Sequence, residues 1–224
     1  MVCVTLEALR HLKIELGETT VAIQGFGNVG SHTARIMHES GAKVVAVSDV
    51  SGGIFNPRGL DIPKLLSTYK FSGQTLAATK LGDPLTNAEL LQLKCTVLVP
   101  AALSEQITKH NASQLNCRVL AEGANGPTTL EADRIVQDKG IFVIPDILAN
   151  SGGVIVSYFE WVQDAQRFFW KATDIQDRLR DLMTSAFQRT LQFATAKGTS
   201  MRMAALMTGI DKVAQAHLSR GLYP

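Results

Sequence analysis

The sequence of this 224-residue chain predicts an α/β fold, a doubly wound and largely parallel sheet followed by a C-terminal helical segment. Two observations lead to this prediction. Over residues 1–149, short and almost continuously apolar runs, typical of strands buried on both faces, alternate with stretches of helical periodicity. From residue 150 onward, only the helical periodicity remains.

The first predicted element is a helix over 2–16, in which apolar residues recur at helical spacing until Gly17. No capping residue or turn precedes it, so we expect the chain to begin as a domain of a longer protein would. The turn-rich stretch 51–59 predicts a small excursion such as a hairpin. Strands are predicted at 20–24, 43–48, 95–99, 118–121 and 141–144. Further helices are predicted at 29–39, 60–69, 86–92, 105–115 and 128–139.

The segment 150–224 is expected to complete one dinucleotide-binding domain spanning 1–224, with its core at 1–149. Its first helix carries one apolar face, formed by Val154, Tyr158, Trp161, Val162, Ala165 and Phe169. Asp174 is the expected N-cap of the second helix. The last helix is predicted from Ser200 to Arg220, and Gly198 and Gly221 fit C-terminal caps.

The composition and net charge of the chain limit the classes of partner that it is expected to bind. Hydrophobic residues make up 46% and charged residues 19%, which is ordinary for a globular protein. A net charge of +2 is too small to predict binding to nucleic acid or to an acidic membrane surface. The apolar runs are too short to span a bilayer, and the N-terminus lacks the pattern of a signal peptide.

The spacing of the cysteines indicates the cellular compartment, and the spacing of the histidines indicates whether a metal site is expected. Cys3, Cys95 and Cys117 form no CxxC pair and are odd in number, which favours reduced thiols in the cytoplasm. The five histidines show neither HxxxH nor HExxH spacing, so we expect no metal site.

A G-x-G-x-x-G pattern at Gly25, Gly27 and Gly30 follows the strand at 20–24 and opens a helix. In a Rossmann-like fold, the first glycine makes the tight turn, the second lets backbone approach a pyrophosphate, and the third lets helix pack on strand. The pattern predicts dinucleotide binding at Gly25, Phe26, Gly27, Asn28, Val29 and Gly30. The alternative is a tight strand-to-helix turn without a ligand.

Asp49 directly follows the strand predicted at 43–48, about 20 residues after the glycine motif. Its carboxylate is expected to accept hydrogen bonds from the adenosine ribose and to disfavour a 2′-phosphate, which favours NAD over NADP. Arg58 or Lys43 could offset that repulsion, so NADP stays possible. Alternatively, Asp49 only starts the turn before Ser51.

Other candidate residues follow the carboxyl ends of the later strands, where such folds bind ligands. They are Ala101 in PAAL, Asn125 in EGANGPT and Asn150 in PDILANSGG. The two amides suit a carboxamide, a ribose or a substrate amine, but both could equally be turn residues. Ser157 lies on the next helix, where it could reach the same cleft or be a buried hydroxyl bonded to its own helix.

These stretches together resemble the C-terminal, cofactor-binding domain of glutamate dehydrogenases, within the glutamate/leucine/phenylalanine/valine dehydrogenase family. The similar segments include TVAIQGFGNVG, LVPAALSEQIT, AEGANGPTT, VIPDILANSGGVIVSYFEWVQ and the closing SRGLYP. The resemblance implies that Ser157 binds the substrate side-chain carboxylate and that Val154 lines its pocket. It also implies that Asn125 and Asn150 face the nicotinamide ribose, the carboxamide and the substrate.

The implied reaction is the NAD(P)-dependent oxidative deamination of L-glutamate to 2-oxoglutarate and ammonia. Family members carry their catalytic lysine and acid/base aspartate in an N-terminal domain, and no segment of this chain matches it. We therefore expect no catalytic residue here, no turnover by this chain alone, and a homo-oligomer as a possible assembly. The alternative function is a non-catalytic nucleotide-binding or assembly module.

Overall fold

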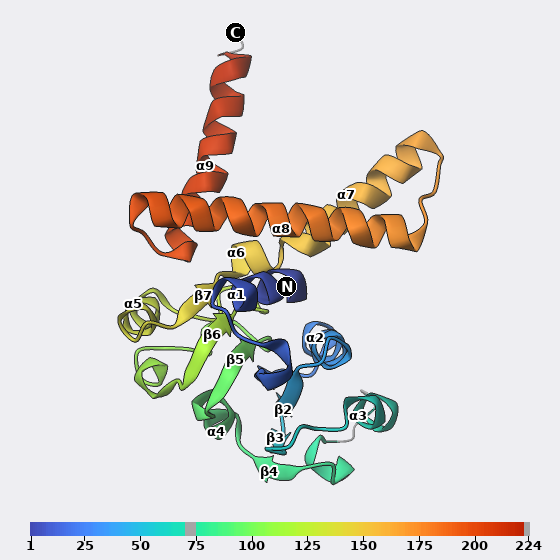
Figure 1. Ribbon diagram of the computed structural model, residues 1–224, viewed down its shortest axis with the longest axis vertical. Coiled ribbons are helices and arrows are strands. Elements are labelled where there is room, and N and C mark those ends of the chain that lie inside the picture. The colour runs from blue at the N-terminus through green and yellow to red at the C-terminus, as the bar shows by residue number, and fades with distance from the viewer. Residues whose placement is uncertain (70–74, 222–224) are drawn as a thin grey trace. The chain divides into compact units, whose positions relative to one another are not determined.

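The structure is a computed structural model that describes residues 1–69 and 75–221 (Figure 1). The chain forms two compact units, Met1–Asn150 and a second that begins at Ser151. The described residues of the first unit form a seven-stranded sheet in the order β4-β3-β2-β1-β5-β6-β7. The predicted α/β fold with a largely parallel sheet is therefore confirmed.

The strand order reverses at β1 (Thr20–Gln24), which pairs in parallel with β2 (Lys43–Asp49) on one side and β5 (Cys95–Pro100) on the other. The parallel ladder continues through β6 (Cys117–Ala121) to β7 (Phe142–Ile144). Beyond β2, the sheet ends in antiparallel β3 (Gly52–Phe55) and β4 (Asp83–Leu85). The excursion expected at 51–59 thus supplies β3, the second arm of a tight hairpin with β2.

Helices cover both faces of the sheet (Figure 1). One face packs against α1 (Val2–His11) and α2 (Asn28–Glu39), and the other against α4 (Asn87–Gln92) and α5 (Leu130–Asp138). Strand residues alternate between the faces, so Ala22, Leu98 and Leu120 meet Leu90, Ala132 and Val136. The short helices α3 (Ile62–Thr68) and α6 (Asp146–Ala149) follow β3 and β7 in the chain.

The helix predicted at 105–115 is wrong. Glu105 has a φ of 55°, and Ile107 forms an isolated parallel bridge with Thr128. The side chain of Asn111 then accepts from the Thr108 amide at 2.8 Å and donates to the Gln106 carbonyl at 2.9 Å. These side-chain bonds replace helical backbone bonds, and only a 3₁₀ turn at Ala112–Gln114 remains.

The helices predicted at 2–16, 60–69 and 128–139 are also shorter in the structure than expected. The first ends at His11 because Lys13 takes a left-handed conformation with a φ of 53°, and a 3₁₀ turn at Leu16–Glu18 follows. The helix predicted at 60–69 is α3, whose start is set by the Asp61 carboxylate, which accepts from the Lys64 amide at 3.0 Å.

The second unit consists of α7 (Ser151–Gln166), α8 (Ala172–Lys197) and α9 (Met201–Arg220). Gly198 ends α8 with a φ of 60°, as predicted. The expected cap at Asp174 is wrong, because α8 starts earlier, after Lys171, and places Asp174 in its first turn. A negative charge still stabilises a helix there.

Helix α7 ends before Arg167, which has a φ of 52°, so Phe169 lies outside the helix that was expected to contain it. The face predicted from apolar spacing is also not the buried one. Val154 and Trp161 are 74% and 65% exposed, whereas Phe159 is buried.

Candidate functional site

The glycine motif forms a turn between β1 and α2 that tolerates no side chain at two of its three glycines. Gly25 has a φ of 94°, and a Cβ added to it would lie 2.8 Å from the backbone of Ala101. Ala101 is held there by its own amide, which donates to the Gln24 carbonyl at 2.7 Å. A Cβ added to Gly30 would lie 1.8 Å from the Gly25 carbonyl oxygen. Close packing of β1, α2 and the loop after β5 therefore requires both glycines.

Gly27 differs from the other two glycines. Apart from its chain neighbours and the backbone of its own helix, no atom of the described residues lies within 4 Å of a Cβ built on it. Gly27 is the N-cap of α2, and the first backbone bond of the helix runs from the Ser31 amide to its carbonyl at 2.9 Å. The amides of Asn28, Val29 and Gly30 precede that bond, as the unpaired donors at a helix start do. This open cradle of donors fits a pyrophosphate.

The remaining residues of the motif divide between core and surface. Phe26 is 2% exposed, and its ring packs edge-on against Tyr69 with 5.5 Å between ring centroids. Its side chain thus supports the loop from beneath, and its backbone is what a ligand would meet. Asn28 and Val29 are exposed at the start of α2.

Asp49 ends β2 at the same edge of the sheet, and four donors of the chain surround its carboxylate. Oδ1 accepts from the Ser51 amide at 2.7 Å and from the Ser51 hydroxyl at 2.5 Å. Oδ2 accepts from the Tyr69 hydroxyl at 2.9 Å and from the Leu76 amide at 3.3 Å. Asp49 does start the turn that the alternative interpretation expected, and it also collects donors from a distant segment.

These bonds set the charge state of the pair. Partial burial by itself raises the pKa of Asp49, but the hydrogen bonds from Ser51, Tyr69 and Leu76 outweigh it and hold that pKa below its ordinary value. Burial, together with the bond to Asp49 and its negative charge, raises the pKa of Tyr69 to about 12. Near neutral pH, Asp49 is therefore an anion and Tyr69 a neutral donor.

The structure brings Asn125 and Asn150 together at the ends of β6 and β7. The side-chain amide of Asn150 donates to Oδ1 of Asn125 at 3.0 Å and to the Ala124 carbonyl at 3.4 Å. The backbone amide of Asn150 donates to the backbone carbonyl of Asp146 at 2.8 Å. The Asp146 carboxylate accepts from the backbone amide of Gly126, also at 2.8 Å. Asp146 therefore ties together the two loops that carry the asparagines.

A fully buried carboxylate supports this arrangement from below. Glu122 is 0% exposed and follows β6 directly, and its Oε2 accepts from the Asp146 amide at 2.9 Å. The second oxygen of Asp146, Oδ1, accepts from the Ile147 amide at 2.8 Å. Both acids thus act on backbone geometry at the start of α6.

Gly123 lies where the loop after β6 meets Ala101 and the glycine loop. A Cβ added to Gly123 would lie 3.0 Å from the Ala101 side chain and 3.3 Å from that of Val29. The glycine loop, Ala101 and the loop after β6 are therefore in close contact at the point where the strand order reverses. In open α/β sheets, ligands bind at this point.

Val154 and Ser157 belong to the other unit, on α7, and both are exposed. The expectation that Ser157 might be a buried hydroxyl is therefore wrong.

Three residues of the site, Tyr69, Glu122 and Asp146, were not predicted from the sequence. For Glu122 a signal existed, since an acid directly after an apolar strand is a candidate for a buried, paired charge.

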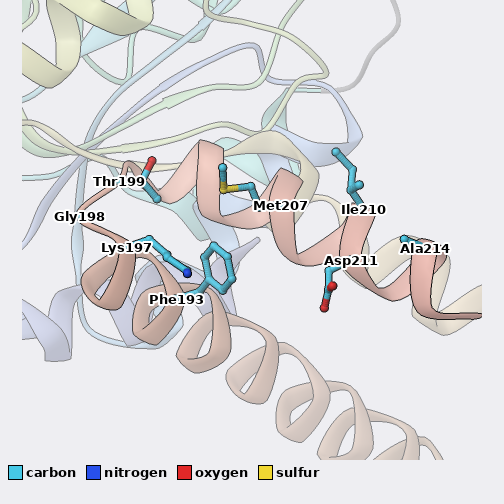
Figure 2. A pocket seen from close by; sticks show the side chains of 8 residues that line it. All are labelled: Phe193, Lys197, Gly198, Thr199, Met207, Ile210, Asp211 and Ala214. Atoms are coloured by element: carbon cyan, nitrogen blue, oxygen red, sulfur yellow. The ribbon is translucent and has the colours of Figure 1, made fainter.

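A cavity of about 800 Å³ lies elsewhere, in the second unit, in the angle between the end of α8 and α9 (Figure 2). Lys197 and Asp211 are the charged members of its lining, and none of the predicted site residues takes part. Its lining residues are Phe193, Lys197, Gly198, Thr199, Met207, Ile210, Asp211 and Ala214.

Within the described ranges, no cluster of three or more His, Cys, Asp or Glu side chains could hold a metal ion. No helix in those ranges has the length and apolar character needed to cross a membrane.

The sheet topology and the glycine loop define an α/β nucleotide-binding fold. The chain belongs to the Glutamate/Leucine/Phenylalanine/Valine dehydrogenase family, whose pattern it matches over residues 1–221. It is 48% identical to the glutamate dehydrogenase of Thermotoga maritima, over 97% of this chain and 52% of that protein. It is 46% identical to the catabolic NAD-specific glutamate dehydrogenase RocG of Bacillus subtilis, over 96% of this chain and 50% of that protein.

Solved structures agree with this assignment. The hetero-hexameric glutamate dehydrogenase of Thermus thermophilus superposes with a TM-score of 0.92 at 31% identity, over 100% of this chain and 52% of that one. The glutamate dehydrogenase of Peptoniphilus asaccharolyticus gives a TM-score of 0.83 at 32% identity, over 99% and 52% of the two chains. The chain therefore spans about half the length of the relatives it matches.

Proposed function

We propose that this chain is the NAD-binding, C-terminal domain of a glutamate dehydrogenase. The observation that carries the proposal is the open space in front of Gly27, at the start of α2, beside the acidic end of β2 at Asp49. A glycine required by a tight turn has either a left-handed backbone or a neighbouring atom in the place of its side chain, whereas Gly27 has a φ of −77° and open space. The open position at Gly27 favours a ligand over the bare-turn alternative.

Different residues of the chain would contact different parts of the proposed cofactor. The amides at the start of α2 would hold the pyrophosphate, and Asp49 would accept from the adenosine ribose. Ala101 and the pair Asn125 and Asn150 would contact the nicotinamide half, since amides can both donate to and accept from a ribose and a carboxamide. When bound, the nicotinamide supplies the hydride acceptor, and the protein's part is to orient it.

NAD is the proposed cofactor rather than NADP. Asp49 is an anion near neutral pH, and a 2′-phosphate placed beside it would meet a like charge. Relatives in Bacillus subtilis and Staphylococcus aureus are named NAD-specific, which supports the same choice.

The proposed substrate pair is L-glutamate and 2-oxoglutarate, with Val154 lining the pocket and Ser157 binding the side-chain carboxylate. Because this chain spans about half of its relatives, we assign the acid/base chemistry to the remaining half and expect cofactor binding without turnover here. One relative is a hetero-hexamer, which supports an oligomeric assembly for the complete enzyme. The three free thiols favour a cytoplasmic location.

Calorimetric titration of the purified chain with NAD, and separately with NADP, tests the proposal. We expect saturable binding of NAD, weaker binding of NADP, and weaker NAD binding in the variants Gly27→Val and Asp49→Ala. Absence of NAD binding by a chain whose thermal unfolding is cooperative would contradict the assignment as a cofactor domain.

A further inference from the structure

We infer that Tyr69 sets the affinity of the proposed NAD site by competing with the adenosine ribose for the carboxylate of Asp49. The inference rests on the proposed function and adds to it a residue that the glycine motif does not contain. Tyr69 lies at the end of α3 and therefore comes from outside the strand–turn–helix unit of the fingerprint.

Four donors of the chain already surround the carboxylate of Asp49. A carboxylate offers about four acceptor positions on its two oxygens. Ser51 fills two of them on Oδ1, and Tyr69 and Leu76 fill two on Oδ2. A ribose hydroxyl can therefore bond to Asp49 only where one of the chain's own donors gives way.

The four donors differ in how they are attached to the rest of the chain. Ser51 is two residues from Asp49 in the chain, so both of its bonds belong to one local turn. Leu76 donates from its backbone, which cannot rotate away without moving the chain. The Tyr69 hydroxyl is the end of a long side chain with two rotatable bonds, and it joins Asp49 across 20 residues of sequence. Of the two residues that donate from a side chain, Tyr69 is the one that reaches Asp49 from outside its own turn, so its withdrawal leaves the turn between Asp49 and Ser51 intact.

The ring of Tyr69 lies against the glycine loop. It packs edge-on against Phe26, inside the glycine loop, with 5.5 Å between centroids and 66° between ring planes. Tyr69 thus touches both the residue expected to bind ribose and the loop expected to bind pyrophosphate. A change confined to its hydroxyl leaves the ring contact with Phe26 in place, so the competition can be tested separately from packing.

The substitution Tyr69→Phe removes the competing donor and keeps the ring. We expect it to bind NAD about threefold to tenfold more tightly than the wild-type chain, which is the worth of one hydrogen bond that the free protein no longer loses. NADP affinity should change by less than about twofold, because the Asp49 charge that opposes a 2′-phosphate remains. The matched control is Tyr158→Phe, the same chemical change at an exposed tyrosine of α7, which should leave both affinities unchanged.

Calorimetric titration with NAD, NADP and an NAD analogue lacking the adenosine 2′-hydroxyl measures these differences. The gain in Tyr69→Phe should shrink to less than about twofold with the deoxy analogue, which a general change in loop stability would not produce. If Tyr69→Phe unfolds at a markedly lower temperature, the titrations are repeated at a temperature at which circular dichroism shows the variant to be folded, and the same dependence on the 2′-hydroxyl is expected.

The outcomes separate the inference from the proposed function. NAD binding by the wild-type chain with equal or weaker binding by Tyr69→Phe overturns the competition and leaves the cofactor domain standing. An equal gain for NAD and its deoxy analogue also overturns it. No NAD binding by the wild-type chain or by either variant overturns the proposed function, and with it the role of Tyr69.

Discussion

The carbonyl oxygen of Gly25 fills the space in which a side chain on Gly30 would have to lie, since an added Cβ would be 1.8 Å from it. Gly27, between them, faces open space instead. The three glycines of one motif therefore answer two different demands, close packing at Gly25 and Gly30 and access for a ligand at Gly27. The two demands make opposite predictions for stability.

Gly30→Ala should destabilise the chain. The methyl group would have to push α2 away from β1, and overpacking of this kind typically costs about 1–3 kcal/mol, here at the upper end because the obstacle is backbone. Urea unfolding followed by circular dichroism measures the loss. A wild-type unfolding midpoint for Gly30→Ala would show that the turn can open without cost.

Gly27→Ala should leave stability within about 0.5 kcal/mol of the wild-type chain, because a φ of −77° suits any residue and the added methyl meets open space. The same methyl would occupy the place proposed for the pyrophosphate, so NAD affinity should fall at least about tenfold. Unfolding and NAD titration on one preparation check both statements. Full NAD affinity in a stable Gly27→Ala chain would mean that the cofactor does not approach the backbone there.

Asp146→Asn should loosen the asparagine pair. Each carboxylate oxygen of Asp146 accepts one backbone amide, from Gly126 and Ile147, and an asparagine would turn an NH₂ group toward one of those donors. We expect a loss of about 1–2 kcal/mol in unfolding free energy, typical of a lost bond to a charged acceptor.

NAD affinity of Asp146→Asn should also fall severalfold, since the two loops that Asp146 joins carry Asn125 and Asn150. The control is Asp138→Asn, the same change at an exposed residue of α5, which should lie within about 0.5 kcal/mol of wild type. Equal behaviour of the two variants would mean that Asp146 does not position the pair.

The pair of Tyr69 and Asp49 gives stability a defined dependence on pH. The pKa of Tyr69 is raised to about 12 in the folded chain, above the ordinary value of about 10. Its contribution is therefore complete below about pH 10 and is lost as the pH rises through about 12. The pKa of Asp49 is lowered, so its contribution is present above its ordinary value of about 3.9 and is lost as the pH falls through its folded pKa.

Tyrosinate absorbance, followed in wild type and in Tyr69→Phe, checks this dependence. The difference between the two titrations should show one tyrosine that ionises near pH 12. A difference titration centred near pH 10 would mean that the hydroxyl of Tyr69 does not bond to Asp49 in solution.

The sheet could be predicted because its signals are local. Each buried strand is an apolar run, and Gly25, Gly27 and Gly30 lie in one turn whose spacing has a known geometry. The surroundings of Asp49 could not be predicted in the same way. Its partners Tyr69 and Leu76 follow it by 20 and 27 residues, and only the folding of the chain brings them to it.

The failure at 105–115 has a similar cause. Apolar periodicity there is compatible with a helix, but Asn111 bonds to the backbone at Thr108 and Gln106, and Ile107 pairs with Thr128. Local side-chain bonds and one long-range pairing together outweigh a weak helical preference. Periodicity carries no information on either.

The thiols of Cys95 and Cys117 should be nearly inert in the native chain. The two residues are register partners on β5 and β6. Burial raises the pKa of the Cys95 thiol, and the nearby Cys117 thiol adds a smaller electrostatic contribution in the same direction. Burial also raises the pKa of Cys117, to about 12. At about pH 8, a thiol with such a pKa is ionised to roughly one part in ten thousand, and the thiolate is the reactive form. A disulfide-exchange reagent should therefore label Cys3 first, and all three thiols only in denaturant. Cys3→Ser gives the sharper test, because rapid labelling of that variant without denaturant would mean that β5 and β6 open far more often than a central strand pair should.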